Sequence, residues 1–372
     1  MMTQENKANL VKRVDSDPDI TDEMINEYFI LENGNYTILK DFKCKELNFG
    51  DENVTILLND ILMITDVLKF GGKSIEIHGG KIRTTSLHFS QKDVFVSMEK
   101  TILSVDSCDF SNINISFSGG IIYCQTMISN STNIQLHLTN LIIGKYIVHD
   151  NKIKIKGDNV FVTENILPFQ DSLSIEMSLG YSMVLSNCFF KGLRYVKTTG
   201  NIKCENKLMV EGTMFFKTTE KMIANKVFID GNIIEFRDGI YEINEMEFSS
   251  ENDKTKWLLI TNASVEIGIC HFEGHEIKIG NNGSLICRQL RINDNTKIQL
   301  KNIPIIIDQL MLFEIINIVG NDVIVRDSFI AQSNSIIFQL DNKYKMKIKT
   351  CDFRNKHVSV KTGKVNCDSG MF

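Results

Sequence analysis

The stretch Lys73–Ile82, KSIEIHGGKI, decides the fold once similar stretches are set beside it. It alternates apolar and polar residues and then turns through two glycines. Variations of it are NVTILLNDI (53–61), KDVFVSMEKTI (92–102), SNINISFSGGI (111–121), TNIQLHLTNL (132–141) and NKIKIKGDNV (151–160). Their apolar pairs begin at Val54, Ile75, Val94, Ile113, Ile134 and Ile153. Short strands and polar turns that recur at a period near 20 predict a solenoid.

A solenoid of this period stacks coils that cannot form a core alone, at a spacing of about 4.8 Å. The signature of leucine-rich repeats and the rhythm of hexapeptide repeats are both absent. Over roughly residues 36–372 the pattern resembles the right-handed parallel β-helix of the pectin-lyase-like superfamily. The resemblance implies an all-β, single-stranded, right-handed parallel β-helix of about 17 coils.

The first residues differ from the rest. The stretch SDPDITDEMINEYFI offers Asp19 or Thr21 as an N-cap and spaces its apolar residues as a helix does. We expect a short amphipathic helix over about residues 19–29 that covers the open edge of the first coil. The predicted domains are therefore 1–35, an N-terminal segment with this capping helix, and 36–372, the β-helix domain.

The nine cysteines show a second, longer repeat. One set follows steps of 80, 82 and 81 along the chain: Cys108, Cys188, Cys270 and Cys351. The other follows steps of 80, 80, 83 and 80: Cys44, Cys124, Cys204, Cys287 and Cys367. Because 80 is four times 20, we infer a duplicated unit of four coils, present about four times.

The cysteines are expected to fill core positions as free thiols. Members of one set lie four coils apart, about 19 Å, too far for a disulfide. Members of different sets, such as Cys108 and Cys124, reach neighbouring coils at offset positions, so a bridge requires turns that differ from the inferred register. His271 and His275 flank Cys270, but the other units have no equivalent histidines, so we expect no metal site.

Phenylalanine also recurs at coil spacing, which predicts an aromatic ladder inside the core. Phe110 follows Phe89 by one coil, and similar turns hold Phe49, Phe190, Phe248, Phe272, Phe329 and Phe353. The alternative is an exposed row that binds sugars, for which Tyr and Trp are the usual residues. The chain has 23 Phe, 8 Tyr and 1 Trp, which favours the core.

The outward residues show no catalytic pattern. The row aligned from sequence contains no acid–base pair: Thr55, Glu76, Phe95, Asn114, Gln135, Lys154, Ser174, Lys278 and Gln299. His78, beside Gly79 and Gly80, is expected in a turn. Two lysine rows are expected to be solvated, with attraction of a polyanion as the alternative: Lys152, Lys154 and Lys156, and Lys343, Lys345, Lys347 and Lys349. We expect no catalytic, cofactor-binding or metal-binding residues, and no cofactor.

The net charge and the lack of long apolar runs limit the classes of function that the sequence allows. The net charge of −5 disfavours nucleic acid as a partner. The start of the chain lacks the apolar region of a signal peptide, and no apolar run is long enough to span a membrane, so we expect a cytoplasmic or virion-associated protein.

The function expected is a non-catalytic structural scaffold that assembles with other protein chains, including copies of itself through the C-terminal coil. The alternative is a β-helix protein that acts on or binds polysaccharide, either lyase- or hydrolase-like or a host-recognition fibre or spike.

Overall fold

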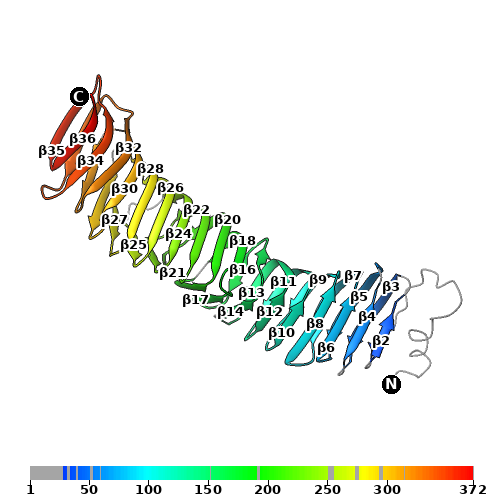
Figure 1. Ribbon diagram of the computed structural model, residues 1–372. Coiled ribbons are helices and arrows are strands. Elements are labelled where there is room, and N and C mark those ends of the chain that lie inside the picture. The colour runs from blue at the N-terminus through cyan, green and yellow to red at the C-terminus, as the bar shows by residue number, and fades with distance from the viewer. Residues whose placement is uncertain are drawn as a thin grey trace. The chain divides into compact units, whose positions relative to one another are not determined.

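The computed structural model describes residues 28–371, apart from 32–33, 39–40, 51–52, 59, 151, 191–192, 250–254, 273–275, 293–295 and 314. This part of the chain is an all-β parallel solenoid with about 20 residues per turn (Figure 1). Each coil contributes to two parallel sheets, called sheet A and sheet B below. None of the described residues forms a helix of the length and apolarity needed to cross a bilayer.

The chain divides into two compact units, residues 1–169 with 175–184 and residues 170–174 with 185–372. In the first unit, sheet A consists of β1 (Tyr28–Leu31), β3 (Phe42–Phe49), β5 (Leu62–Phe70), β7 (Lys81–Phe89), β9 (Ile102–Asp109), β11 (Ile121–Ser129), β13 (Asn140–Val148), β15 (Val160–Val162) and β16 (Ile166–Pro168). Sheet B consists of β2 (Gly34–Thr37), β4 (Val54–Leu57), β6 (Ser74–His78), β8 (Asp93–Glu99), β10 (Asn114–Ser118), β12 (Asn133–His137) and β14 (Lys152–Lys156).

The second unit repeats this arrangement. Sheet A has β20 (Asn201–Val210), β22 (Lys221–Ile229), β24 (Ile240–Phe248), β26 (Ser264–Phe272), β28 (Ser284–Ile292), β30 (Ile305–Leu312), β32 (Val323–Ala331), β34 (Lys345–Asp352) and β36 (Lys364–Met371). Sheet B has β19 (Tyr195–Thr199), β21 (Thr213–Thr218), β23 (Ile233–Arg237), β25 (Lys256–Thr261), β27 (Glu276–Gly280), β29 (Lys297–Lys301), β31 (Ile315–Val319), β33 (Ser335–Leu340) and β35 (His357–Thr362). Two strands contain residues of both units, β17 (Ser172–Glu176) and β18 (Ser182–Phe189).

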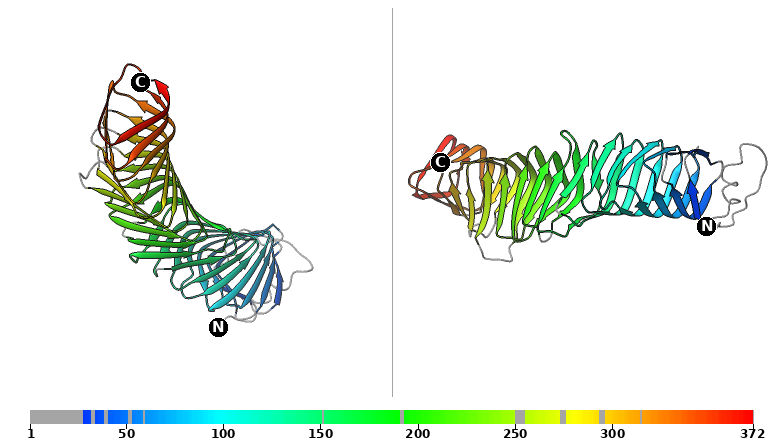
Figure 2. Two further views of the ribbon diagram at one scale, coloured as in Figure 1. Left: turned by 60° about the vertical axis from the view of Figure 1, so that its left-hand side comes forward. Right: turned by 90° about the horizontal axis from the view of Figure 1, so that it is seen from below.

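Most strands of sheet A turn a corner in the middle. In β5, Asp66 and Val67 both point outward, so the inward residues on the two sides of the corner are Thr65 and Leu68. Neighbouring strands keep the same corner, because Thr65 pairs with Thr84 and the register resumes at Val67. One strand of sheet A therefore covers two sides of its coil. Figure 2 shows successive strands stacked side by side.

The predicted aromatic ladder is confirmed. In the first unit the ring centroids of Phe49, Phe70, Phe89 and Phe110 follow one another at 5.2, 5.5 and 5.2 Å. In the second unit Phe248 stacks on Phe272 at 5.5 Å and Phe329 on Phe353 at 5.4 Å. Stacked aromatic pairs contribute about 0.5–1.5 kcal/mol beyond the burial of their surface.

The solenoid begins before the predicted boundary at residue 36. β1 pairs in parallel with β3, and β2 with β4, so both strands belong to the stack. Residues 19–27 of the helix predicted over residues 19–29 lie outside the described residues. Its last two residues, Tyr28 and Phe29, are in β1, and the inward Phe29 is buried.

The cysteines correct one expectation. Eight of them form one disulfide in each copy of the four-coil unit: Cys108–Cys124, Cys188–Cys204, Cys270–Cys287 and Cys351–Cys367. The paired Cα atoms lie 5.9 to 6.4 Å apart, inside the range that a disulfide spans. The prediction of free thiols is therefore wrong for these eight. Only Cys44 is free, and it is buried.

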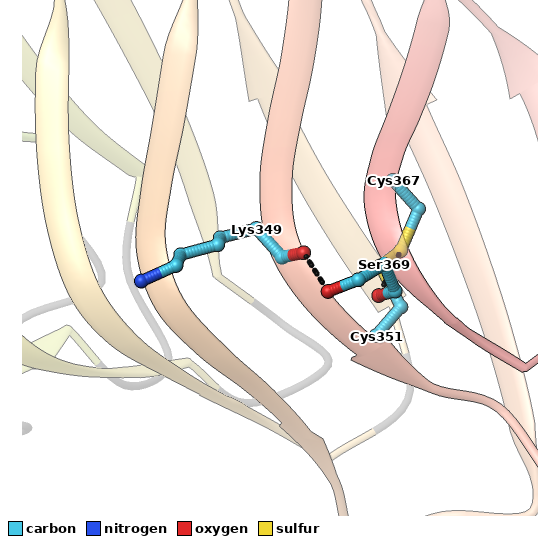
Figure 3. Close-up of a disulfide and its surroundings, with 4 residues drawn as sticks. All are labelled: Lys349, Cys351, Cys367 and Ser369. Atoms are coloured by element: carbon cyan, nitrogen blue, oxygen red, sulfur yellow. Dashed lines mark hydrogen bonds between the residues drawn. A yellow bond between two sulfur atoms is a disulfide. The ribbon is translucent and has the colours of Figure 1, made fainter.

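The last disulfide lies close to a hydrogen bond between the same two strands (Figure 3). Cys351 lies on β34 and Cys367 on β36, which are neighbouring strands of sheet A. On the same two strands the Ser369 hydroxyl donates a hydrogen bond to the carbonyl oxygen of Lys349 at 2.9 Å. The two coils are thus joined by a covalent bond and by side-chain hydrogen bonding at one corner.

Candidate functional site

A groove crosses the outer surface of sheet B in the first unit, over β8, β10, β12 and β14, with a volume of about 900 Å³. Two rows of side chains, one residue from each strand, form its floor. The first row is Asp93, Asn114, Asn133 and Lys154. The second row is Phe95, Ser116, Gln135 and Lys156. We call this surface the Phe95 groove.

The first row is tied together by hydrogen bonds between side chains. The Asn114 amide donates to Asp93 Oδ1 at 2.8 Å, and the Asn133 amide donates to Asn114 Oδ1 at 2.6 Å. Each donor is one coil beyond its acceptor, so the amides form a ladder across the strands. The ladder fixes the orientation of these amides before any ligand arrives.

The second row carries an exposed aromatic ring. Phe95 is 43% exposed, in contrast to the core phenylalanines. Next to it in register is Ser116, whose hydroxyl lies 3.5 Å from Gln135 Oε1. The row therefore offers one apolar surface followed by polar groups and a lysine.

The structure corrects the outward row aligned from sequence. Phe95, Asn114 and Gln135 do point outward, but they belong to two different rows. The register joins Val94 to Ile115, not to Ile113, which is a slip of two positions. A slip of two is hard to detect because side chains alternate with period two, so it leaves every residue on its predicted face.

A second polar cluster lies on the outer surface of sheet B in the second unit, and the sequence-based row does not include it. Glu235 points outward from β23 yet is only 5% exposed. Its Oε2 accepts a hydrogen bond from Arg237 Nη2 at 2.9 Å, and its Oε1 accepts one from the Thr261 hydroxyl at 2.6 Å. Burial opposes ionisation of Glu235, but these two hydrogen bonds outweigh it and lower the pKa of the carboxyl.

The neighbours of Glu235 are mostly charged or aromatic. Lys217 forms an ion pair with Asp238 at 3.0 Å. The Arg237 guanidinium lies 4.9 Å from the centre of the Phe215 ring. A groove of about 600 Å³ opens beside this cluster. Its cations are engaged by Glu235 and Asp238, so the cluster is an ion-pair network rather than a set of unpaired charges.

The other residues singled out in the sequence lie apart from these grooves or on solvated surfaces. His78 ends β6, with Nδ1 3.1 Å from Glu99 Oε2, and the turn that follows contains Gly79 and Gly80 at positive φ. Lys345, Lys347 and Lys349 share the exposed face of β34, whereas Lys343 is in the preceding turn. Within the described ranges, no three His, Cys, Asp or Glu side chains converge as metal ligands do.

An apolar row occupies the outer surface of sheet A in the first unit. Tyr123 on β11 lies beside Ile142 on β13, and Ile142 lies beside Phe161 on β15. Tyr123 is 41% and Phe161 38% exposed, and Ile142 is half-buried. We call these three residues the Tyr123 row. In the second unit an outward isoleucine row occupies the same sheet: Ile286, Ile306 and Ile324.

Comparison with protein-family models, with curated proteins and with solved structures yields no match. What can be said of function therefore rests on the surfaces of this chain.

Proposed function

We propose that this chain is a non-catalytic structural solenoid that assembles with a second copy of itself through the Tyr123 row. The observation that carries the proposal is a row of three apolar side chains on three neighbouring strands, of which Tyr123 and Phe161 are exposed and Ile142 is half-buried. The outer surface of a half-solvated sheet normally carries polar residues, and an exposed apolar patch marks a contact surface. Tyr123 and Phe161 supply aromatic rings of the kind that dominate binding energy at interfaces.

A second copy is the partner that fits this surface best. The three side chains of the Tyr123 row are uncharged, so two copies related by a two-fold axis bring like apolar surfaces together. The outward isoleucines next to it, Ile102 and Ile121, enlarge the apolar surface available to the same partner. Contact through the C-terminal coil stays a separate prediction.

The corner disulfides support a structural role. Each one cross-links two neighbouring coils, and a disulfide stabilises mainly by restricting the unfolded chain. Disulfides persist in oxidising surroundings, including virion surfaces, and are rare in the cytosol. Of the two locations expected from the sequence, we therefore propose the virion-associated one.

The test is the oligomeric state in solution. Light scattering coupled to size-exclusion chromatography should show the wild-type chain as a dimer or larger species that dissociates on dilution. Ile142→Lys places a charge in the middle of the Tyr123 row, so we expect this variant to be monomeric at the same concentrations.

The matched control is Ile240→Lys. Ile240 is an isoleucine at the start of β24, 50% exposed and outside the row, and the same substitution there should leave the assembly unchanged. A wild-type chain that is monomeric at every concentration, or an Ile142→Lys variant that assembles like the wild type, would overturn the proposal.

A further inference from the structure

Residues 341–372 carry a local excess of positive charge. This part of the second unit contains eight Lys and Arg and three Asp, whereas the whole chain has 41 Lys and Arg and 46 Asp and Glu. The net charge of the chain is −5, so these coils differ in sign from the chain as a whole. A cationic stretch in an otherwise acidic chain is typical of a surface that binds anions.

Two lysines of these coils lie side by side in the strand register. Lys345 on β34 pairs with Lys364 on β36, and both are exposed. Like charges at directly neighbouring positions destabilise a sheet. Among the described residues, the ion pair on these two strands joins Lys347 to Asp368 at 3.3 Å and leaves out Lys345 and Lys364. The two lysines therefore suit an anion from outside the chain.

An apolar row leads to these lysines on the same face of sheet A. The outward side chains Ile286, Ile306 and Ile324 occupy one register row, and the next position of that row is Lys347. Ile324 is 38% exposed, and the other two isoleucines are half-buried. Lys345 and Lys347 are two positions apart on β34 and so share this face. We call the following residues the Ile324 face: Ile286, Ile306, Ile324, Lys345, Lys347 and Lys364.

Two acids beside the apolar row are matched by arginines. Arg288 Nη2 lies 2.6 Å from Glu266 Oε1, and Arg326 Nε lies 3.7 Å from Asp308 Oδ1. Ion pairs of this kind weaken the repulsion that a carboxylate exerts on an approaching anion. The isoleucines are thus bordered by paired charges on one side and by cations at the end of their row.

We propose that the Ile324 face docks on a lipid bilayer that contains anionic lipids. A bilayer offers negative headgroups and, directly below them, apolar chains, which is the combination that this face matches. The lysines contact the headgroups, while the isoleucines and the methylene stems of the lysines pack against the upper part of the acyl chains. A nucleic acid matches only the lysines, because the face contains no aromatic ring on which bases stack.

The experiment compares two kinds of vesicle with the full chain. One consists of phosphatidylcholine alone, and in the other about one lipid in three is phosphatidylserine, so the pair isolates the contribution of the negative headgroups. Co-sedimentation over a series of lipid concentrations gives the affinity for each. We expect binding to the vesicles with phosphatidylserine to be at least about tenfold tighter, because several lysines lie near the surface.

A pair of lysine substitutions locates the binding. Lys345→Gln with Lys364→Gln should weaken binding to the anionic vesicles about tenfold or more, because it removes the two lysines that lie side by side. The matched control is Lys154→Gln with Lys156→Gln on β14, which changes the net charge by the same amount in the first unit. This control should bind the vesicles like the wild type.

An uncharged substitution tests the apolar part of the face. Ile324→Asn should weaken binding to the anionic vesicles about fivefold, because it removes the most exposed isoleucine of the face from contact with lipid. The matched control is Leu57→Asn on β4, where the leucine is 37% exposed, and it should bind like the wild type. Thermal unfolding of all four variants checks that the fold is retained.

Four results would contradict the inference. They are equal affinity for the two kinds of vesicle, equal affinity of the two lysine variants, full affinity of Ile324→Asn, and binding of an oligo-dT that vesicles with phosphatidylserine do not displace. The third result would leave a surface that is merely cationic, and the fourth would assign it to nucleic acid. The assembly proposal concerns the first unit and is read by oligomeric state, so the two proposals can fail independently.

Discussion

Cys108 and Cys124 are joined by a disulfide although neither faces the other in the strand register. Cys108 pairs with Met127, and Cys124 pairs with Val105, which is an offset of three positions. In a flat parallel sheet that offset corresponds to about 10 Å along the strand, too far for the bond. Cys124 and Met127 flank the corner of β11, where Gln125 and Thr126 both point outward. The corner turns the two inward positions toward each other, and this brings the thiols together.

Loss of one corner disulfide should destabilise the chain measurably. The bond between Cys108 and Cys124 closes a loop with a sequence separation of 16. Cross-linking a loop of about that length contributes roughly 3 kcal/mol by restricting the unfolded chain. We expect Cys108→Ala with Cys124→Ala to lower the free energy of unfolding by about 2–4 kcal/mol in urea titrations. Cys44→Ala removes a buried thiol but no cross-link and should cost less.

The same disulfides predict the count of reactive thiols. Alkylation of the denatured, unreduced chain should modify one cysteine, Cys44, and prior reduction should raise the count to all nine. Mass spectrometry of the intact chain gives both numbers. If all nine react without reduction, the bridges are absent under the conditions of purification, and the stabilisation argued for them is lost.

Truncation of a phenylalanine in the aromatic ladder should destabilise the chain more than truncation of one on the outer surface. Phe110 is fully buried between Phe89 and Phe117, with centroids at 5.2 and 6.1 Å. Phe110→Ala should cost about 3–5 kcal/mol, because it leaves a cavity in a packed core. Phe95→Ala makes the same change on the outer surface and should stay within about 0.5 kcal/mol. Equal losses in thermal or urea unfolding would contradict the assignment of the two phenylalanines.

The sequence is sufficient to predict the fold, because period and alternation are properties of the chain itself. The regular interval between strands and the recurrence of Phe89 and Phe110 lead to the solenoid and its ladder. The exact register does not follow in the same way. Alignment of the repeats by their interval pairs Val94 with Ile113, whereas the structure pairs Val94 with Ile115. The alternation does not reveal this error, because a shift of two positions leaves every residue on the same face. The disulfides escape prediction because two consecutive outward residues shift the alternation at a corner but do not show how far the strand bends there.

The Glu235 cluster escapes prediction for a different reason. Ile233 on β23 pairs with Trp257 on β25, and the connection between these strands is longer than in most coils, so it breaks the regular rhythm. Alignment of the repeats by their interval therefore does not include β23 and β25. The signal that is available is local: Glu235 and Arg237 are two positions apart on one strand and so must share a face.

A glycine at positive φ should be required where the neighbouring coil lies close. Gly157 has φ of 106°, and a Cβ there would clash with the carbonyl oxygen of Leu136 one coil earlier. Gly212 has φ of 74°, but a Cβ there meets nothing within 4 Å. Gly212→Ala should therefore lower the free energy of unfolding by about 1–2 kcal/mol through the backbone conformation alone. Gly157→Ala should lower it by about 3 kcal/mol or more, because the clash adds to this cost. Urea unfolding of the two variants gives the comparison, and equal costs would argue against close coil contact at Gly157.

The ion pair between the buried Glu235 and the partly exposed Arg237 should make part of the stability depend on pH. Hydrogen bonds from Arg237 and Thr261 lower the pKa of the Glu235 carboxyl in the folded chain below its unfolded value of about 4.3. The unfolded chain then binds a proton more readily than the folded one at acidic pH. The stabilisation is therefore complete above the unfolded pKa and is lost as the pH falls through the folded pKa.

Glu235→Gln removes this dependence, so the difference in unfolding midpoint between the wild type and the variant should be largest near pH 7 and should shrink as the pH falls below about 4.3. Glu211→Gln, at an exposed position after β20, is the matched control and should leave the unfolding midpoint close to that of the wild type at pH 7. The difference in midpoint between the wild type and Glu235→Gln is the useful measure, because the contributions of the other carboxyls are present in both chains and cancel in the difference. A difference that is constant from pH 7 to pH 3 would show that Glu235 contributes through packing and not through its charge.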